Sequence, residues 1–179
     1  MLLKIVQICL PEFVMLKKMK DLFGLTADAF QCKVPELNGL SYDECLIKYA
    51  LFTKEQSEKS ILSGQCLDEL KSRLYYNSCI YGQKLRKILH VKNRKDAVKA
   101  LQTVYKLIGI NFHCECDNKG RFKIDKCFFS KYYSKEVCKL ISSLDEGLAS
   151  GLTDGGKLCF MHRITEGNSC CEGFLCCQK

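Results

Sequence analysis

The sequence of 179 residues predicts an α+β fold, in which a helical N-terminal half is packed on a four-stranded antiparallel sheet built from two hairpins with an intervening helix. Up to Gly109, apolar residues recur at three- and four-residue steps, the spacing of helices with one buried face. After Gly109 the period changes to two, as in half-buried strands. The helical spacing returns once, over residues 135–150, between two alternating regions. Two paired hairpins with helices on one face form an α+β layer architecture.

The length and composition indicate one ordinary globular domain. A chain of 179 residues can bury a real core without covalent staples, and 47% hydrophobic with 27% charged residues excludes a disordered chain. We expect residues 1–40 to form an N-terminal extension or a first helix, and residues 41–179 to form a single α+β domain. Met1 and Met19 are both candidate starts of translation.

The helix with the clearest start begins at Ser41. Ser41 and Glu44 have the spacing of a capping box, in which each side chain satisfies an amide near the other. We expect this helix to run to about Lys59. Its inward-facing candidates are Leu46, Tyr49, Ala50 and Thr53.

Two further helices are predicted before the strands. Residues 66–89 keep a near-heptad apolar spacing, with an interruption expected near Asn77. The next helix begins at Asn93 and stops at Gly109. Because the link between them is short, we expect these two helices to form an antiparallel pair on one side of the sheet.

The first hairpin and the last helix follow Gly109. Residues 110–115 and 121–127 flank a turn at 117–120 that is rich in residues tolerant of left-handed conformations. Ser134 is the expected N-cap of the helix over 135–150. Glycine accepts the positive φ that ends a helix, and the expected stops are Gly151, Gly155 and Gly156.

A second hairpin is predicted at the C-terminal end. The stretch from Leu158 to Thr165 alternates, which is typical of a half-buried strand. Turn-forming residues separate it from a second short run, over 170–177. One face of the first strand would hold Leu158, Phe160, His162 and Ile164.

The formal charge of +8 is concentrated in one region. Between Lys71 and Lys106 there are ten Lys or Arg against the single acid Asp96, so the rest of the chain is about neutral. Lys95, Lys99 and Lys106 fall along one edge of a helix, which would face nucleic acid or another anionic partner. A solvated helix face explains the same pattern. A homodimer is left open as a further assembly.

The cysteine content bears on the compartment. Fourteen cysteines in a secreted chain would indicate a disulfide framework, but residues 1–20 lack a convincing signal peptide. No run reaches the roughly 18 apolar residues that span a bilayer. We therefore expect a reducing cytoplasm, in which cysteines are buried hydrophobes, metal ligands or reactive thiols.

Three segments carry a resemblance to known families: YGQKLRKIL at 81–89, DEGLASGL at 145–152 and ITEGNSCCEGF at 164–174. Together with the order of elements, they resemble the 4-vinyl reductase domain and the related α+β fold of TRAPP-type trafficking subunits. Clustered cysteines after a helix and a short G-x-x-C-C strand are also similar to the L-2-amino-thiazoline-4-carboxylic acid hydrolase family. The resemblance covers residues 41–177 and implies a pocket between helices and sheet for a small, largely apolar ligand.

Several cysteines have a placement compatible with a metal site. Cys114 and Cys116 would point to the same face of a strand, where two thiolates can share one metal ion. Cys138 is a further thiol that could approach them in space. No pair has the C-x-x-C spacing of a zinc or iron–sulfur (Fe–S) site, and buried free thiols explain the pattern as well. The candidate ligands for Zn or Fe–S are Cys114, Cys116, Cys127, Cys170 and Cys171.

A thiol site is a second alternative. Cys138 lies in the first turn of the last helix, where the dipole and free amides can lower a thiol pKa and make a nucleophile. Ser142 and Asp145 share its helix face, and His162 is the best-placed base in the sequence pattern. The apolar neighbours of His162 on its strand favour a packed histidine instead.

Carboxylates give the third alternative. Asp145 and Glu146, with Arg163 and Glu166, would converge at one edge of the sheet, where they could bind a zwitterionic substrate or activate water. A rim ion pair between Arg163 and Glu166 explains the last two equally well. The candidate catalytic residues are therefore Cys138, Asp145, His162, Arg163 and Glu166.

The leading prediction is a cytoplasmic small-molecule-binding domain with its pocket between the helix over 135–150 and the two hairpins. If it is an enzyme, the resemblance implies a hydrolase that acts on a small cyclic amidine or amino-acid-like substrate. The alternatives are a basic interaction protein that binds nucleic acid or another anionic partner, and a cysteine-ligated metal protein.

Overall fold

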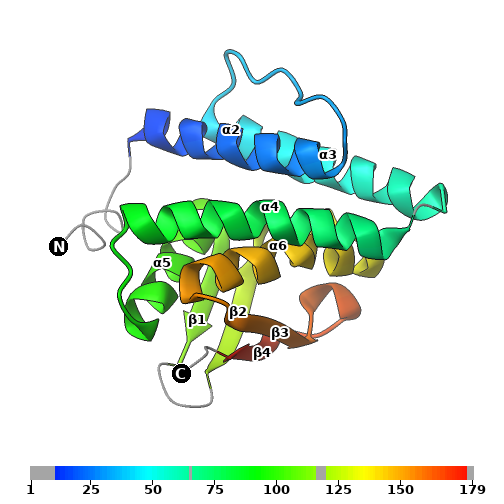
Figure 1. Cartoon of the computed structure of the whole chain (residues 1–179). Coiled ribbons are helices and arrows are strands. Elements are labelled where there is room, and N and C mark those ends of the chain that lie inside the picture. The colour runs from blue at the N-terminus through cyan, green and yellow to red at the C-terminus, as the bar shows by residue number, and fades with distance from the viewer. Residues whose placement is uncertain (1–10, 65, 116–119, 177–179) are drawn as a thin grey trace.

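The computed structural model describes residues 11–64, 66–115 and 120–176 (Figure 1). The elements follow in the order α2 (Glu12–Ala29), α3 (Tyr42–Leu62), α4 (Leu67–Ile88), α5 (Arg94–Leu107), β1 (Ile110–Cys114), β2 (Arg121–Cys127), a 3₁₀ turn (Phe128–Lys131), α6 (Lys135–Thr153), β3 (Lys157–His162), a second 3₁₀ turn (Ile164–Glu166) and β4 (Cys171–Cys176). This order confirms the predicted α+β fold class. Most of the predicted turn at 117–120 lies outside the described residues.

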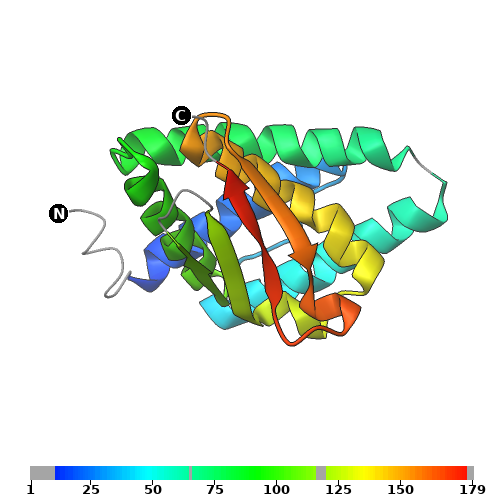
Figure 2. The same ribbon diagram turned by 90° about the horizontal axis from the view of Figure 1, so that it is seen from below.

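The four strands form one antiparallel sheet in the order β1-β2-β4-β3. The hairpins are joined where β2 pairs with β4, and Phe122 stands opposite Gly173. A Cβ at Gly173 would lie 2.7 Å from the Phe122 ring and would overlap the carbonyl oxygen of Cys159, so this position requires glycine. The helices lie on one face of the sheet, with α5 and α6 nearest to it and α2 and α3 farthest (Figures 1 and 2).

Helix α4 packs along α6, and this is the most extensive contact between described helices. We expected α4 to pair with α5, and this expectation is wrong because glycines on both helices select α6 as the partner. Gly82 of α4 faces Gly151 of α6, so the two backbones touch. A Cβ at Gly82 would lie 2.7 Å from the carbonyl oxygen of Leu148, and one at Gly147 would overlap that of Tyr75.

Capping residues set the helix starts as predicted. The amide of Ser41 donates to the Glu44 carboxylate at 2.8 Å, and the Ser41 hydroxyl accepts from the Glu44 amide, which completes the capping box. Asn93 accepts from an amide in the first turn of α5, and Ser134 does the same for α6. Each cap is a local contact, so the sequence alone is enough to place it.

Two predicted helix boundaries are wrong. Helix α6 passes Gly151 and ends at Thr153, where Asp154 takes the left-handed conformation at φ 61°. Gly151 instead allows the close approach of α4. Helix α4 is not interrupted at Asn77, because the Asn77 side chain points out of the helix and donates to the Leu25 carbonyl oxygen of α2 at 3.0 Å.

The strand predicted from Leu158 to Thr165 ends earlier, at His162. Its pairing with β4 shifts between Phe160 and His162, which breaks the alternation of faces, and Ile164 begins a 3₁₀ turn. His162 is therefore exposed and does not pack beside the buried Leu158.

Helix α2 is part of the main core. Met19 and Phe23 are fully buried in it, and the Phe23 ring meets the Tyr49 ring of α3 edge-on, with centroids 5.1 Å apart. The first described helix therefore helps to enclose the space between helices and sheet. Among the described residues, no helix combines the length and the apolar character that crossing a membrane requires.

Candidate functional site

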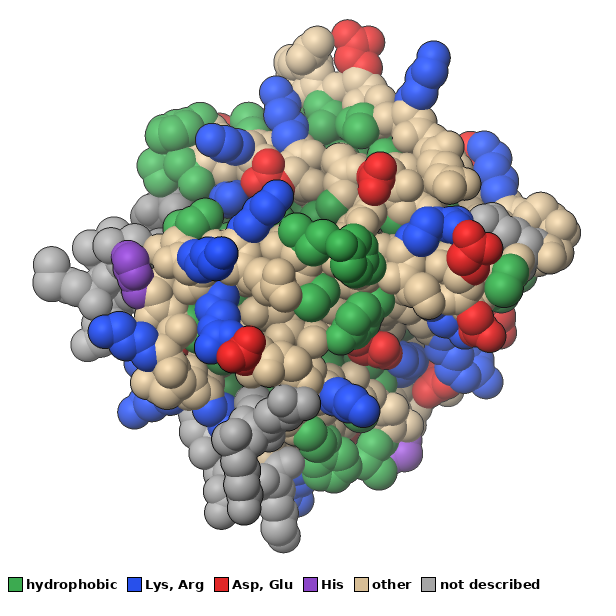
Figure 3. All heavy atoms as spheres, in the orientation of Figure 1, with side chains coloured by type: hydrophobic (Ala, Val, Ile, Leu, Met, Phe, Trp, Pro, Cys, Tyr) green, Lys and Arg blue, Asp and Glu red, His purple; other side chains and the backbone are tan. Residues whose placement is uncertain are grey.

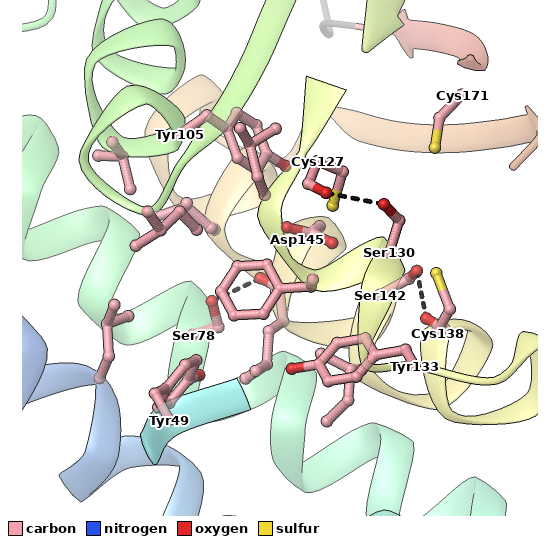
Figure 4. Close-up of a pocket in the computed structure, with 18 of the residues that line it drawn as sticks. Tyr49, Ser78, Tyr105, Cys127, Ser130, Tyr133, Cys138, Ser142, Asp145 and Cys171 are labelled. Carbon is pink, nitrogen blue, oxygen red and sulfur yellow. Dashed lines mark hydrogen bonds between the residues drawn. The ribbon is translucent and has the colours of Figure 1, made fainter. Parts of the chain in front are cut away.

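A cavity of about 100 Å³ lies between the helical layer and the inner face of the sheet (Figure 4). Every described helix contributes to its wall, together with the end of β2 and the start of β4. The wall is mostly apolar and includes Leu22, Leu25, Val104, Ile108, Phe129, Ile141, Leu144, Leu148 and Ile164. The location agrees with the predicted pocket beside the helix over 135–150, but the helical half supplies more of the wall than we expected.

Asp145 is the one carboxylic acid among the described lining residues. It lies on α6, and Figure 4 shows its carboxyl group in the middle of the cavity, near Tyr105 and Cys127. Burial raises the pKa of Asp145 to about 7, because apolar surroundings disfavour the carboxylate. The Tyr105 hydroxyl and the Arg163 guanidinium partly oppose this rise in pKa, and Glu146 adds to it. Both protonation states of Asp145 are therefore populated at neutral pH.

Tyr105 presents a second polar group beside Asp145. Its side chain is fully buried on α5, and its hydroxyl has no hydrogen-bond partner at normal distance within the described chain. The hydroxyl lowers the pKa of Asp145 as a hydrogen-bond donor would, although no hydrogen bond of normal geometry joins the two groups. A buried hydroxyl without a partner costs roughly 1–3 kcal/mol. A ligand that accepts from this hydroxyl would recover that cost.

Several other polar groups of the wall are already hydrogen-bonded inside the protein, as buried polar groups usually are. The pairs are Tyr49 with Thr26, Tyr133 with Thr53, Ser78 with the carbonyl oxygen of Leu144, Ser130 with that of Cys127, and Ser142 with that of Cys138. These groups hold the wall in place. Asp145 and Tyr105 are left to recognise a polar group of a ligand, together with the buried Thr165 hydroxyl, which likewise has no hydrogen-bond partner in the described chain.

Three thiols line the cavity: Cys127, Cys138 and Cys171. Burial raises the pKa of each, and that of Cys127 reaches about 12. The expectation that the helix start lowers the pKa of Cys138 is wrong. The amide of Cys138 is already bonded to Ser134, and burial outweighs the lowering by Thr165 and Arg163. At neutral pH these thiols are protonated and act as apolar wall groups.

Cys127 should therefore react with iodoacetamide at pH 7.5 at least about tenfold more slowly than the exposed Cys66, because the thiolate is the reactive form. Mass spectrometry of alkylated peptides over time measures both rates in one sample. In urea, where the chain is unfolded, the two rates should become similar. Equal rates in the native protein would contradict the placement of Cys127.

The cavity contains only part of the predicted catalytic set. Cys138 and Asp145 line it, whereas His162 is exposed and outside its wall. The shift in strand pairing turns His162 away, so it is not placed to act as a base for Cys138.

Arg163 and Glu166 also lie outside the described lining. The Arg163 guanidinium donates to the Ser142 hydroxyl at 2.8 Å and lies 4.1 Å from the centre of the Phe160 ring. It therefore holds Ser142, which lines the cavity, in position. The Glu166 carboxylate pairs with Lys139 at 3.0 Å and not with Arg163. Both have structural partners that account for their positions.

The four predicted metal ligands that the structure describes are not gathered into a metal-binding group. Within 11–64, 66–115 and 120–176, no group of three or more Cys, His, Asp or Glu is placed to hold a metal ion. Cys127 and Cys171 face the cavity, whereas the Cys170 thiol approaches the Glu172 carboxylate at 3.4 Å. The Cys114 thiol lies against backbone carbonyl oxygens, and Cys116 is outside the described residues.

The basic region from Lys71 to Lys106 extends over α4 and α5, and Figure 3 shows Lys and Arg side chains gathered where α4 ends and α5 begins. Of the predicted anion-binding residues on α5, Lys95 and Lys106 are exposed and Lys99 is half-buried. Nucleic-acid binding through these residues stays a prediction.

Tyr49 and Tyr105 are two of the cavity residues that the sequence did not reveal as site residues. Both were predicted to be in helices, but their apolar spacing indicated only a core position. The available signal is chemical, because a tyrosine on a buried stripe needs a partner for its hydroxyl. That requirement indicates a buried polar group nearby without identifying it.

The sequence matches no protein-family model, and no curated protein matches it.

Proposed function

We propose that the protein binds a small, largely apolar molecule that carries a protonated amine or amidine, with the charged group at Asp145. The observation that carries this proposal is a single carboxylic acid on the described wall of a mostly apolar cavity. Small-molecule sites commonly combine an apolar wall, which supplies affinity, with a few fixed polar groups that set orientation.

A cation is the partner that such an acid selects. An ionised carboxylate in apolar surroundings is costly unless a positive group pairs with it. Arg163 does not fill this role, since its guanidinium is held on Ser142 at 2.8 Å and lies outside the described lining. A ligand ammonium group would complete the ion pair. An amidinium group would add a second N–H bond to the other carboxylate oxygen.

Hydrolysis is the second candidate, and the pKa of about 7 at Asp145 favours it. A carboxylate that titrates near neutral pH can take a proton from water while the water oxygen adds to the C=N carbon of a protonated amidine, and the electrons of the C=N double bond move to nitrogen. Return of that proton to the departing nitrogen then breaks the C–N bond and releases the amine. The resemblance to the L-2-amino-thiazoline-4-carboxylic acid hydrolase family implies a cyclic amidine as the substrate. Incubation with 2-aminothiazoline, followed by NMR of the ring protons, tests this activity.

Titration calorimetry with isobutylamine at pH 8, with isobutanol as the uncharged match, tests the binding proposal. We expect Asp145→Asn to weaken amine binding about tenfold to hundredfold, because a hydrogen bond to a charged group contributes roughly 1.5–3 kcal/mol. The affinity for isobutanol should change less than the affinity for the amine. Absence of amine binding, or equal binding by both proteins, would refute the proposal.

A further inference from the structure

A second cavity, of about 200 Å³, adjoins the first. It lies between α2, the C-terminal part of α4 and α5. Both cavities are lined by Leu22, Tyr81, Val104 and Ile108, so these four side chains form the boundary between them. We call the cavity at Asp145 the inner chamber and the second cavity the outer chamber.

The outer chamber differs from the inner one in chemistry. Its wall is almost entirely apolar, and no Asp or Glu is among its described lining residues. Its Lys18 ammonium is paired with Asp21 at 3.1 Å and lies 5.7 Å from the centre of the Tyr81 ring. The Thr103 hydroxyl donates to the Lys99 carbonyl oxygen at 2.8 Å. Such a wall suits hydrocarbon.

The outer chamber also reaches the protein surface. Ile88 is part of its wall and is 59% exposed. The rim at Ile88 and the acid of the inner chamber therefore lie on opposite sides of the boundary that Tyr81 helps to form. The inner chamber alone, at about 100 Å³, is smaller than an engineered cavity of roughly 150 Å³ that binds benzene. The two chambers together approach the lower limit of roughly 300 Å³ for ligand pockets.

From this arrangement, we infer that the two chambers form one bipartite site for a cationic amphiphile, a primary amine with an unbranched alkyl chain. The amine lies at Asp145, and the chain passes Tyr81 and Val104 into the outer chamber. This inference rests on the proposed function and adds the shape of the ligand to it. The inner chamber binds the charged end of the ligand, and the size of the outer chamber sets the length of alkyl chain that can be buried.

A series of n-alkylamines from propylamine to octylamine, measured by calorimetry at pH 8, tests the inference. Affinity should rise about fourfold for each added methylene that is buried. The rise should stop once the chain reaches the rim at Ile88. Alkanols of the same lengths should show the same dependence on chain length with weaker binding.

Leu107→Phe is the blocking variant, because Leu107 lines the outer chamber and not the inner one. It should leave propylamine affinity unchanged within about twofold and remove most of the gain from longer chains. Leu107→Met, which conserves volume, is the matched control and should keep the gain. If Leu107→Phe loses its helical circular dichroism, Leu89→Phe replaces it, since Leu89 also lines only the outer chamber.

The outcomes separate the two proposals. Propylamine binding without a gain for longer chains would overturn the bipartite site and leave the proposed function intact. A gain that persists in both blocking variants would place the chain elsewhere and would also overturn the bipartite site. Failure of every amine to bind would overturn both.

Discussion

Replacement of Gly151 by alanine is expected to lower the free energy of unfolding by about 1–3 kcal/mol, because overpacking of a tight contact typically costs this much. A Cβ at Gly151 would overlap the Cys79 carbonyl oxygen and would lie 2.8 Å from the Gln83 amide nitrogen. Both are backbone atoms of α4, so neither can rotate away. Helix α4 would have to move from α6, and the cavity wall would move with it.

Gly24→Ala is the matched control for this substitution. Gly24 also lies inside a helix, α2, but a Cβ there would have no neighbour within 4 Å. Alanine at Gly24 should therefore stabilise the protein by up to about 1 kcal/mol through its higher helix propensity. Urea unfolding of both variants measures the two changes. A Gly151→Ala protein as stable as Gly24→Ala would contradict the close contact of α4 and α6.

Asp145→Asn is expected to stabilise the protein above pH 7. The change that it causes in the free energy of unfolding should be more favourable there than at low pH, by up to about 4 kcal/mol. In the folded protein the pKa of Asp145 is about 7, whereas in the unfolded chain it returns to about 3.9. A raised pKa means that the stability contributed by this group is fully present below about pH 3.9 and is lost as the pH rises through about 7. Asparagine has no charge to bury, so the variant does not lose this stability as the pH rises.

The measurement is the free energy of unfolding in urea at a series of pH values from 4 to 8, for both proteins. The difference between the two curves isolates Asp145, because Glu146, whose pKa burial also raises, is present in both. The wild type should lose stability relative to the variant from about pH 4 to about pH 7, and the difference should level off above that. A difference that does not change with pH would show that Asp145 is hydrated like a surface carboxylate.

The elements that the sequence predicted well depend on contacts within a few residues. Ser41 and Glu44, Asn93 and Ser134 each cap a helix through an amide three residues away at most. The change from helical to alternating apolar spacing after Gly109 is also a local signal, because it depends only on the side to which each successive residue points.

The errors arise where a distant partner decides the role of a residue. The sequence around Gly151 would look the same whether the glycine ends a helix or allows another helix to pack closely. Only the contact with α4 shows that it has the second role. A helix start favours a reactive thiol at Cys138, but burial of this thiol in the folded protein reverses the effect on its pKa. Asp145 and Tyr105 come from different helices, and no spacing in the sequence connects them.

The contact between α4 and α6 also constrains how the chain can fold during synthesis. The Ser78 hydroxyl is bonded to the Leu144 carbonyl oxygen across 66 residues, and Leu70 and Leu74 of α4 are buried in a cluster with Leu140 of α6. Until α6 has left the ribosome, this face of α4 has no cover. The helical half should therefore not fold cotranslationally as a unit, and its exposed leucines would need a chaperone or fast completion of the chain to avoid aggregation.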